Sequence, residues 1–267
     1  LNNGVVDMKA ISLRDIRKRF MAQPEKYLNL KKQRGMTLLE IIIVLGIIGT
    51  IAAGVVILAQ RAYDSKAMTD LTTNINTIRT SMKDAYGSTG IYPLPAGTAT
   101  AALNDQTITG AAGQATPIGK LIALGKLSTD EAKNNISNNF ISVGAGDISA
   151  NGIQKGYFIE INGLTQQQCR NILLQTGNSF DYVEVTNNAP VGAYNYDNTS
   201  VELYHATSGV TPAVPGADAN HPGTPALLTG SGVFRSLVTG GNTQITADGV
   251  INACTDDSSN SVVLGSR

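Results

Sequence analysis

The residues around Gly35 have the types and the order that a specific cleavage of the chain would use. A cationic block, Lys31 to Arg34, precedes Gly35, and an apolar run begins at Met36. An ordinary secretory signal has the opposite order, with an apolar core of about 7 to 15 residues and then a small-residue cleavage site. Cleavage after Gly35 would therefore leave the apolar run on the mature chain and create a new amine at Met36.

The apolar run from Met36 to Ala59 contains one ionisable residue, Glu40. From Ile41 to Ala59 no residue is charged, and at about 1.5 Å per residue this stretch forms a helix of roughly 28 Å, close to the ~30 Å hydrocarbon thickness of a bilayer. Lysines and arginines gather on its N-terminal side. We therefore expect the preceding residues to stay in the cytoplasm and those after Ala59 to be exported.

The segment GMTLLE, from Gly35 to Glu40, followed by an apolar helix resembles the prepilin peptidase site of type IV pilins. Methionine after the glycine, together with the long leader, resembles the type IVb subclass. Further stretches are similar to the toxin-coregulated pilin and its enterotoxigenic colonisation-factor relatives: Leu58–Ser65, Ile91–Pro93, Leu124–Asn134 and Gly163–Cys169.

The resemblance implies an α+β type IV pilin fold. In this fold a long N-terminal helix has a protruding hydrophobic half and an amphipathic half packed on an antiparallel β-sheet, with one C-terminal disulfide. It implies a cleaved leader at 1–35, a transmembrane and assembly helix at 36–59, and a globular head at 60–267. Peptidase cleavage would be followed by methylation of the Met36 amine.

The partners implied are other copies of the chain, joined through their N-terminal helices, together with prepilin peptidase and the inner-membrane pilus assembly machinery. The subunit would be held in the inner membrane before assembly and would form an extracellular fibre for adhesion or bacterial aggregation, touching host or bacterial surfaces. Alternatives are a minor pilin, a type II secretion pseudopilin, or, from another class, a signal-anchored periplasmic binding protein or enzyme.

Glu40 carries a charge at a depth in the membrane where a charged side chain has a free-energy cost. We therefore expect Glu40 to have an oppositely charged partner. The Met36 amine of a neighbouring subunit is one candidate, and the alternative is that Glu40 serves only peptidase recognition. Three glycines, Gly46, Gly49 and Gly54, interrupt the apolar stretch. They favour either close helix packing or a place where the helix melts locally in a filament.

Two cysteines, Cys169 and Cys254, lie in the part of the chain expected to be exported, where a disulfide is the natural state of such a pair. The bond would close an 85-residue loop, which chain-entropy reasoning values at roughly 4.5 kcal/mol. The alternative is a pair of free buried thiols.

The remaining polar residues form no catalytic pattern. His205 and His221 have no nucleophile and base around them in the sequence, and Glu160, Glu184 and Glu202 are expected on the solvated face of strands. The segment Asp256–Asn260 is rich enough in oxygens to hold calcium, but we expect a solvated turn there. We therefore expect no enzyme activity, no cofactor and no metal.

Net charge also restricts the partners. Residues 1–35 contain nine basic and three acidic side chains, so the rest has 11 basic and 17 acidic side chains, a net charge of −6. An acidic mature protein argues against nucleic acid as a partner.

Periodicity predicts the elements that position these residues. An apolar stripe from Met68 to Ala85 at spacings of three and four, with no proline between Met36 and Tyr86, predicts one helix of about 51 residues. Residues 96–116 are expected to be a surface loop, and shorter helices are expected at 117–127 and after Thr165. The expected strands are 156–163, 180–185, 200–206, 232–238 and 261–265, in an antiparallel sheet, with an exposed loop at 207–228.

Overall fold

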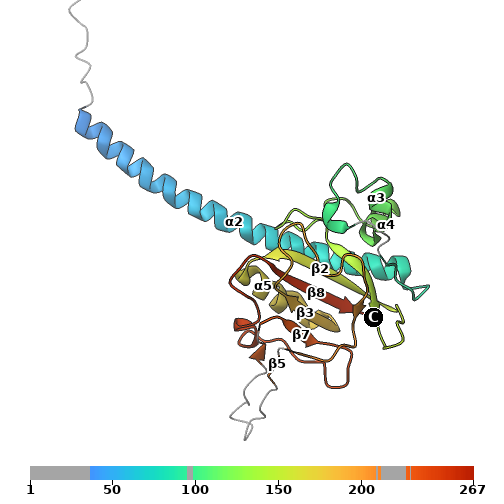
Figure 1. Ribbon diagram of the computed structural model, residues 1–267. Coiled ribbons are helices and arrows are strands. Elements are labelled where there is room, and N and C mark those ends of the chain that lie inside the picture. The colour runs from blue at the N-terminus through green and yellow to red at the C-terminus, as the bar shows by residue number, and fades with distance from the viewer. Residues whose placement is uncertain (1–36, 95–98, 209, 212–226, 229) are drawn as a thin grey trace, which may run out of the picture. The chain divides into compact units, whose positions relative to one another are not determined.

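The computed structural model describes residues 37–94, 99–208, 210–211, 227–228 and 230–267 (Figure 1). The chain divides into two compact units, Leu1–Ala59 and Gln60–Arg267. Gly35, Met36 and His221 lie outside the described residues, as does most of the segment expected to be an exposed loop at 207–228.

The predicted long helix is confirmed as α2, which runs from Leu38 to Tyr86 over 49 residues. In the second unit its apolar stripe is buried, and Ala85 is partly buried against the same core. Two polar residues share the stripe because their side chains bond to backbone carbonyls. Asn74 Nδ2 donates to Lys133 O at 3.0 Å, and Ser81 Oγ donates to Lys126 O at 2.9 Å.

Among the described residues the main sheet has six strands in the order β4-β1-β2-β8-β3-β7. Figure 1 labels β2, β8, β3 and β7 in this order. All neighbouring pairs are antiparallel except β1 and β4, which are parallel, so the prediction of an antiparallel sheet is confirmed but for this edge. The strands are β1 (Ser142–Asp147), β2 (Gly156–Leu164), β3 (Tyr182–Thr186), β4 (Val201–Glu202), β7 (Gly232–Arg235) and β8 (Asn260–Ser266), and a separate pair is formed by β5 (Val210–Thr211) and β6 (Leu227–Leu228).

Both faces of the sheet are covered. On the first face, Tyr157, Ile159 and Ile161 of β2 join the core that includes the α2 stripe. On the second face, Phe158 joins a smaller core with Val263 and four other buried residues: Tyr182, Val201, Leu203 and Val233. Every residue of β2 is consequently buried.

Residues 189–204, here called the covering segment, run over the second face and include the edge strand β4. Asn162 Nδ2 of β2 donates to the carbonyl oxygens of Pro190 and Ala193 at 3.2 and 2.9 Å. At the other end, Leu203 occupies a site lined by glycines of three strands. A Cβ at Gly146, Gly156 or Gly265 would lie within 2.6 Å of a Leu203 methyl group, so this close approach requires glycine.

The expectation of a surface loop at 96–116 is wrong in part. The described residues of this stretch form η2 (Thr100–Ala102) and α3 (Ala111–Gln114), and Leu103 and Ile108 are buried in the main core. The composition, rich in Ala, Thr and Gly, gave no sign that Leu103 and Ile108 are buried, because isolated apolar residues show no periodicity.

The helix expected at 117–127 is present as α4 (Pro117–Ala123) but ends early. Its N-cap is Thr116, whose Oγ1 accepts from Gly119 N at 3.3 Å. It stops because Gly125 adopts a left-handed φ of 66°. A capped turn follows, in which the Glu131 carboxylate accepts from Ser128 N at 2.9 Å.

Candidate assembly helix and disulfide site

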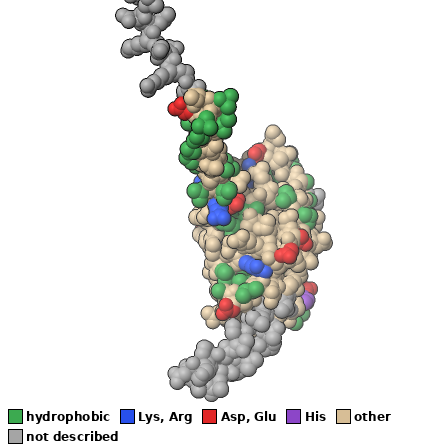
Figure 2. All heavy atoms as spheres, turned by 90° about the vertical axis from the view of Figure 1, so that its left-hand side faces the viewer, with side chains coloured by type: hydrophobic (Ala, Val, Ile, Leu, Met, Phe, Trp, Pro, Cys, Tyr) green, Lys and Arg blue, Asp and Glu red, His purple; other side chains and the backbone are tan. Residues whose placement is uncertain are grey.

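The first part of α2, from Leu38 to Ala59, is exposed along its whole length. Hydrophobic side chains cover its surface (Figure 2). Among the described residues, α2 is the one helix long and apolar enough to cross a membrane, with a mean hydropathy of 3.0 over its best window. Nothing in the described structure buries this apolar surface, so its burial must come from lipid or from other molecules.

Glu40 lies in the first turn of α2, with its side chain exposed. Its backbone N donates to Thr37 O at 3.0 Å and to Thr37 Oγ1 at 3.3 Å, so Thr37 caps the helix N-terminus. Thr37 and Glu40 have the spacing of a capping box, and a carboxylate in this turn interacts favourably with the helix dipole. The sequence pattern T-L-L-E is the signal that marks this role of Thr37.

The helix passes through Gly46, Gly49 and Gly54 without interruption. A Cβ added at any of the three would meet nothing within 4 Å. In a single subunit these glycines therefore make no close contact, and the choice between helix packing and local melting stays open.

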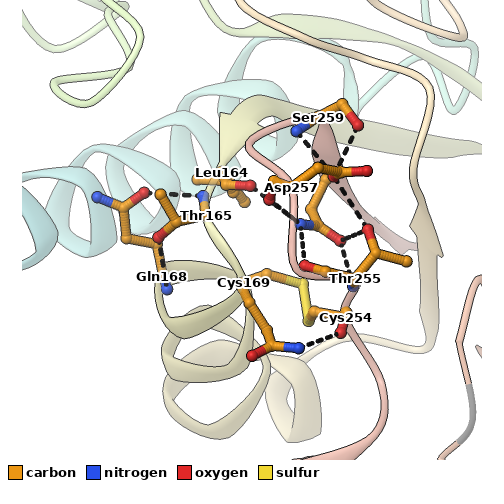
Figure 3. The surroundings of a disulfide bond; sticks show 10 residues. Leu164, Thr165, Gln168, Cys169, Cys254, Thr255, Asp257 and Ser259 are labelled. Carbon is orange, nitrogen blue, oxygen red and sulfur yellow. Dashed lines mark hydrogen bonds between the residues drawn. A yellow bond between two sulfur atoms is a disulfide. The ribbon is translucent and has the colours of Figure 1, made fainter.

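The predicted disulfide is confirmed between Cys169 and Cys254, whose Cα atoms are 6.3 Å apart. Cys169 lies on α5 (Gln166–Thr176), which starts with a complete capping box between Thr165 and Gln168 (Figure 3). Gln166 Nε2 donates to Cys254 O at 3.0 Å. Both cysteines are buried, so the bond joins α5 to the segment before β8 inside the core.

The segment after Cys254 is a turn whose own side chains satisfy its backbone (Figure 3). Asp257 Oδ1 accepts from Ser259 N at 3.1 Å and from Thr255 Oγ1 at 3.0 Å. Asn260 Nδ2 donates to Leu164 O at 3.1 Å, which links the turn to β2. These bonds hold the C-terminal cysteine opposite α5. Within the described ranges no group of three His, Cys, Asp or Glu residues could hold a metal ion.

The expectation that Glu160, Glu184 and Glu202 all lie on a solvated face is wrong for the first two. Glu202 is exposed, Glu184 is half-buried, and Glu160 is fully buried beneath the covering segment. The Glu160 carboxylate accepts from Asn195 N (2.8 Å), Tyr196 N (3.0 Å), Ser261 Oγ (2.9 Å) and Asn195 Nδ2 (3.0 Å). Burial raises the pKa of Glu160, and these four donors oppose the rise. The alternation of side chains along β2 indicates that Glu160 faces away from α2. It does not indicate that a second core covers this face of the sheet.

Comparison with known proteins decides the family. Residues 120–221 match the family described as toxin-coregulated pilus subunit TcpA, and residues 30–56 match the prokaryotic N-terminal methylation motif. A toxin coregulated pilin of Vibrio cholerae serotype O1 is 36% identical over 177 residues, covering 66% of this chain and 73% of the relative. The chain belongs to the toxin-coregulated pilin family.

Two further similarities agree. A second toxin coregulated pilin of Vibrio cholerae is 39% identical over 153 residues, covering 57% of this chain and 62% of that relative. The crystal structure of TcpA, a type IV pilin from the El Tor biotype of Vibrio cholerae, shares the fold with a TM-score of 0.52 at 23% identity, covering 76% of this chain and 99% of that one. This protein is thus a type IVb pilin, a structural subunit of a pilus, in a family whose fold serves assembly rather than catalysis.

Proposed function

We propose that this pilin is made as a precursor, cut after Gly35 by a prepilin peptidase and methylated on the new Met36 amine. Residues 1–35 are then the leader, 36–59 the membrane and assembly helix, and 60–267 the head. The observation that carries this proposal is the exposed apolar surface of α2 from Leu38 to Ala59, directly after the junction. The match of residues 30–56 to an N-terminal methylation motif supports it.

Before assembly the subunit sits in the inner membrane as a single-pass protein with its C-terminal part in the periplasm. Extraction from the bilayer exposes the apolar helix, and many identical helices can bury one another. The pilin therefore polymerises through its N-terminal helices into an extracellular fibre. By analogy with its family, the fibre serves adhesion or bacterial aggregation.

Substitution of Gly35 by valine tests the cleavage. A β-branched side chain beside the scissile bond should block a peptidase that accepts a small residue, so Gly35→Val should leave only uncut, membrane-bound precursor. Intact mass of wild-type subunits should show a methylated N-terminus at Met36. Gly4→Val changes a glycine away from the junction and should be processed normally. Mature-length subunit in Gly35→Val cells would contradict the assignment.

We further propose that Glu40 sets the axial register of the fibre. The Met36 amine of an incoming subunit would meet Glu40 of its neighbour, and two charges 4 Å apart attract by ~4 kcal/mol at an effective dielectric of 20. Because Thr37 caps the same turn, loss of the helix cap is a competing explanation for any defect at Glu40.

Glu40→Gln and Thr37→Ala separate these roles. Glu40→Gln keeps the shape while losing the charge, so it should be processed normally yet yield few sheared filaments. Thr37→Ala loses a cap worth about 1 kcal/mol and should retain most of the yield. The processed fraction and the sheared yield are measured in the same cells. Failure to process Glu40→Gln would assign the residue to peptidase recognition, and a normal yield would exclude the register role.

A further inference from the structure

A cavity of about 240 Å³ lies on the second face of the sheet, away from the α2 stripe. Its walls come from β3, from the covering segment and the residues just after it, and from β7. Two tyrosines and two carboxylates define its character: Tyr182, Tyr196, Glu184 and Glu202. Such a site combines aromatic surface with negative charge.

The Glu184 carboxylate is held in this cavity by neutral groups. Tyr182 OH donates to its Oε2 at 2.9 Å, and Tyr196 OH donates to the same oxygen at 2.9 Å. Burial raises the pKa of Glu184, and these two hydroxyl groups oppose the rise. No ion pair among the described residues includes Glu184 or Glu202.

The chain around the cavity offers no lysine or arginine. Between Arg170 and Arg235 the sequence contains neither residue type. Arg235 itself, on β7, donates to Asn178 Oδ1 at 3.1 Å and to Thr243 O at 3.0 Å, so its guanidinium is engaged elsewhere. His205 also lines the cavity, and its Nδ1 lies 3.0 Å from the neighbouring carbonyl oxygen of Ala206.

Charge is divided unevenly along the second unit. Residues 171–267 contain two basic and eight acidic side chains, whereas residues 60–170 contain nine basic and eight acidic ones. In the latter range Lys83, Lys120 and Lys155 have no carboxylate partner among the described residues. A fibre of identical subunits joins two different surfaces of the molecule, so the acidic cavity of one subunit can meet such a lysine of its neighbour.

We propose that the cavity between β3 and the covering segment receives a lysine side chain from a second copy of the pilin in the fibre. The lysine stem would lie against the ring of Tyr196, which is partly exposed, and its ammonium group would pair with Glu184 and Glu202. This inference rests on the polymerisation proposed above, and adds to the helix contacts a specific contact between heads.

A carbodiimide, which joins carboxylates to amines in contact, tests the proposal on sheared filaments and on detergent-solubilised full-length subunits. Peptides are identified by mass spectrometry. Lys126 Nζ lies 2.6 Å from Asp84 Oδ2 within one subunit, so their cross-link is the positive control in both samples. We expect a link from Glu184 or Glu202 to a lysine in filaments alone. Lys83→Gln, Lys120→Gln and Lys155→Gln, made singly, should identify the donor, because one of them loses that link.

Two results would overturn the proposal. One is the control link in filaments without any lysine link to Glu184 or Glu202. The other is the same lysine link in dispersed subunits, which would place the donor in the same chain. Failure of the polymerisation proposal looks different, because the wild-type protein would then yield no filaments to treat.

Discussion

The two parts of α2 have the same secondary structure and opposite surroundings. From Leu38 to Ala59 the helix carries one charged residue, Glu40, and no residue is buried, whereas from Met68 to Met82 only one stripe is apolar and that stripe is covered by the head. The second part finds its partner within its own chain. The first part carries apolar surface that the described chain does not cover, so its partner must be lipid or other molecules.

The largest expected effect on stability lies in the second unit, at the disulfide. Cys169→Ser should lower the free energy of unfolding by roughly 4.5 kcal/mol, because the 85-residue loop becomes free in the unfolded state. Cys254→Ser and the double variant should behave alike, since losing either partner loses the whole bond. The measurement is subunit level in the periplasm and the urea midpoint in detergent. Wild-type stability of the double variant would show the bond to be dispensable.

A matched pair of isoleucines tests the comparison directly. Ile75 is fully buried and Ile47 is 54% exposed, on the same helix. Ile75→Ala should cost about 2–5 kcal/mol through lost contacts and a cavity, and Ile47→Ala should leave head stability unchanged. Urea unfolding of the full chain in detergent can be followed by tyrosine fluorescence, because the sequence lacks tryptophan. Equal losses in the two variants would mean that the first part of the helix is covered by its own chain.

The smallest expected effect concerns the buried carboxylate of the second unit. Because the pKa of Glu160 is raised in the folded state, the folded protein binds this proton more tightly than the unfolded chain does. Its contribution is thus most favourable below the ordinary pKa of 4.5 and is lost as pH rises through the folded value. The free energy of unfolding of wild type, measured relative to that of Glu160→Gln, should therefore fall as the pH rises from 4.

Thermal midpoints in detergent across this range measure that difference. Glu160→Gln also has a constant cost, since an amide replaces an oxygen that accepts hydrogen bonds, and the pH-dependent part is the quantity of interest. Glu202→Gln removes the same charge from an exposed position and is the control. A difference that grows more favourable to wild type as pH rises would contradict the argument.

Helices and strands with a regular spacing of apolar residues were predictable from the sequence. The α2 stripe, the alternation of β2 and the capping box at Thr165 each reflect one local rule. The strand β1 was not predicted, because SVGAGD has no alternation of apolar and polar residues. Its glycines are explained only by tertiary contacts, since a Cβ at Gly144 would lie 2.7 Å from the Phe158 ring.

The residues of the candidate site also differ in how far the sequence predicts their place in the structure. The pairing of the cysteines followed from their number and expected compartment, and Glu40 stood out as the one charge in an apolar run. The burial of Glu160 and Glu184 could not be predicted, because the covering segment has no period that marks it as a layer over the sheet. Thr37 was visible in the sequence as part of a capping pattern.

The place of β8 in the sheet determines when the head can finish folding. This strand follows every other described strand in the sequence, yet it lies in the middle, paired to β2 on one side and β3 on the other. Until residues 260–266 are available, β2 and β3 have no common partner and Leu203 lacks the glycine that β8 contributes to its site. A chain without β8 would therefore have a split sheet with two open edges, and the pairing of β8 with β2 and β3 closes it.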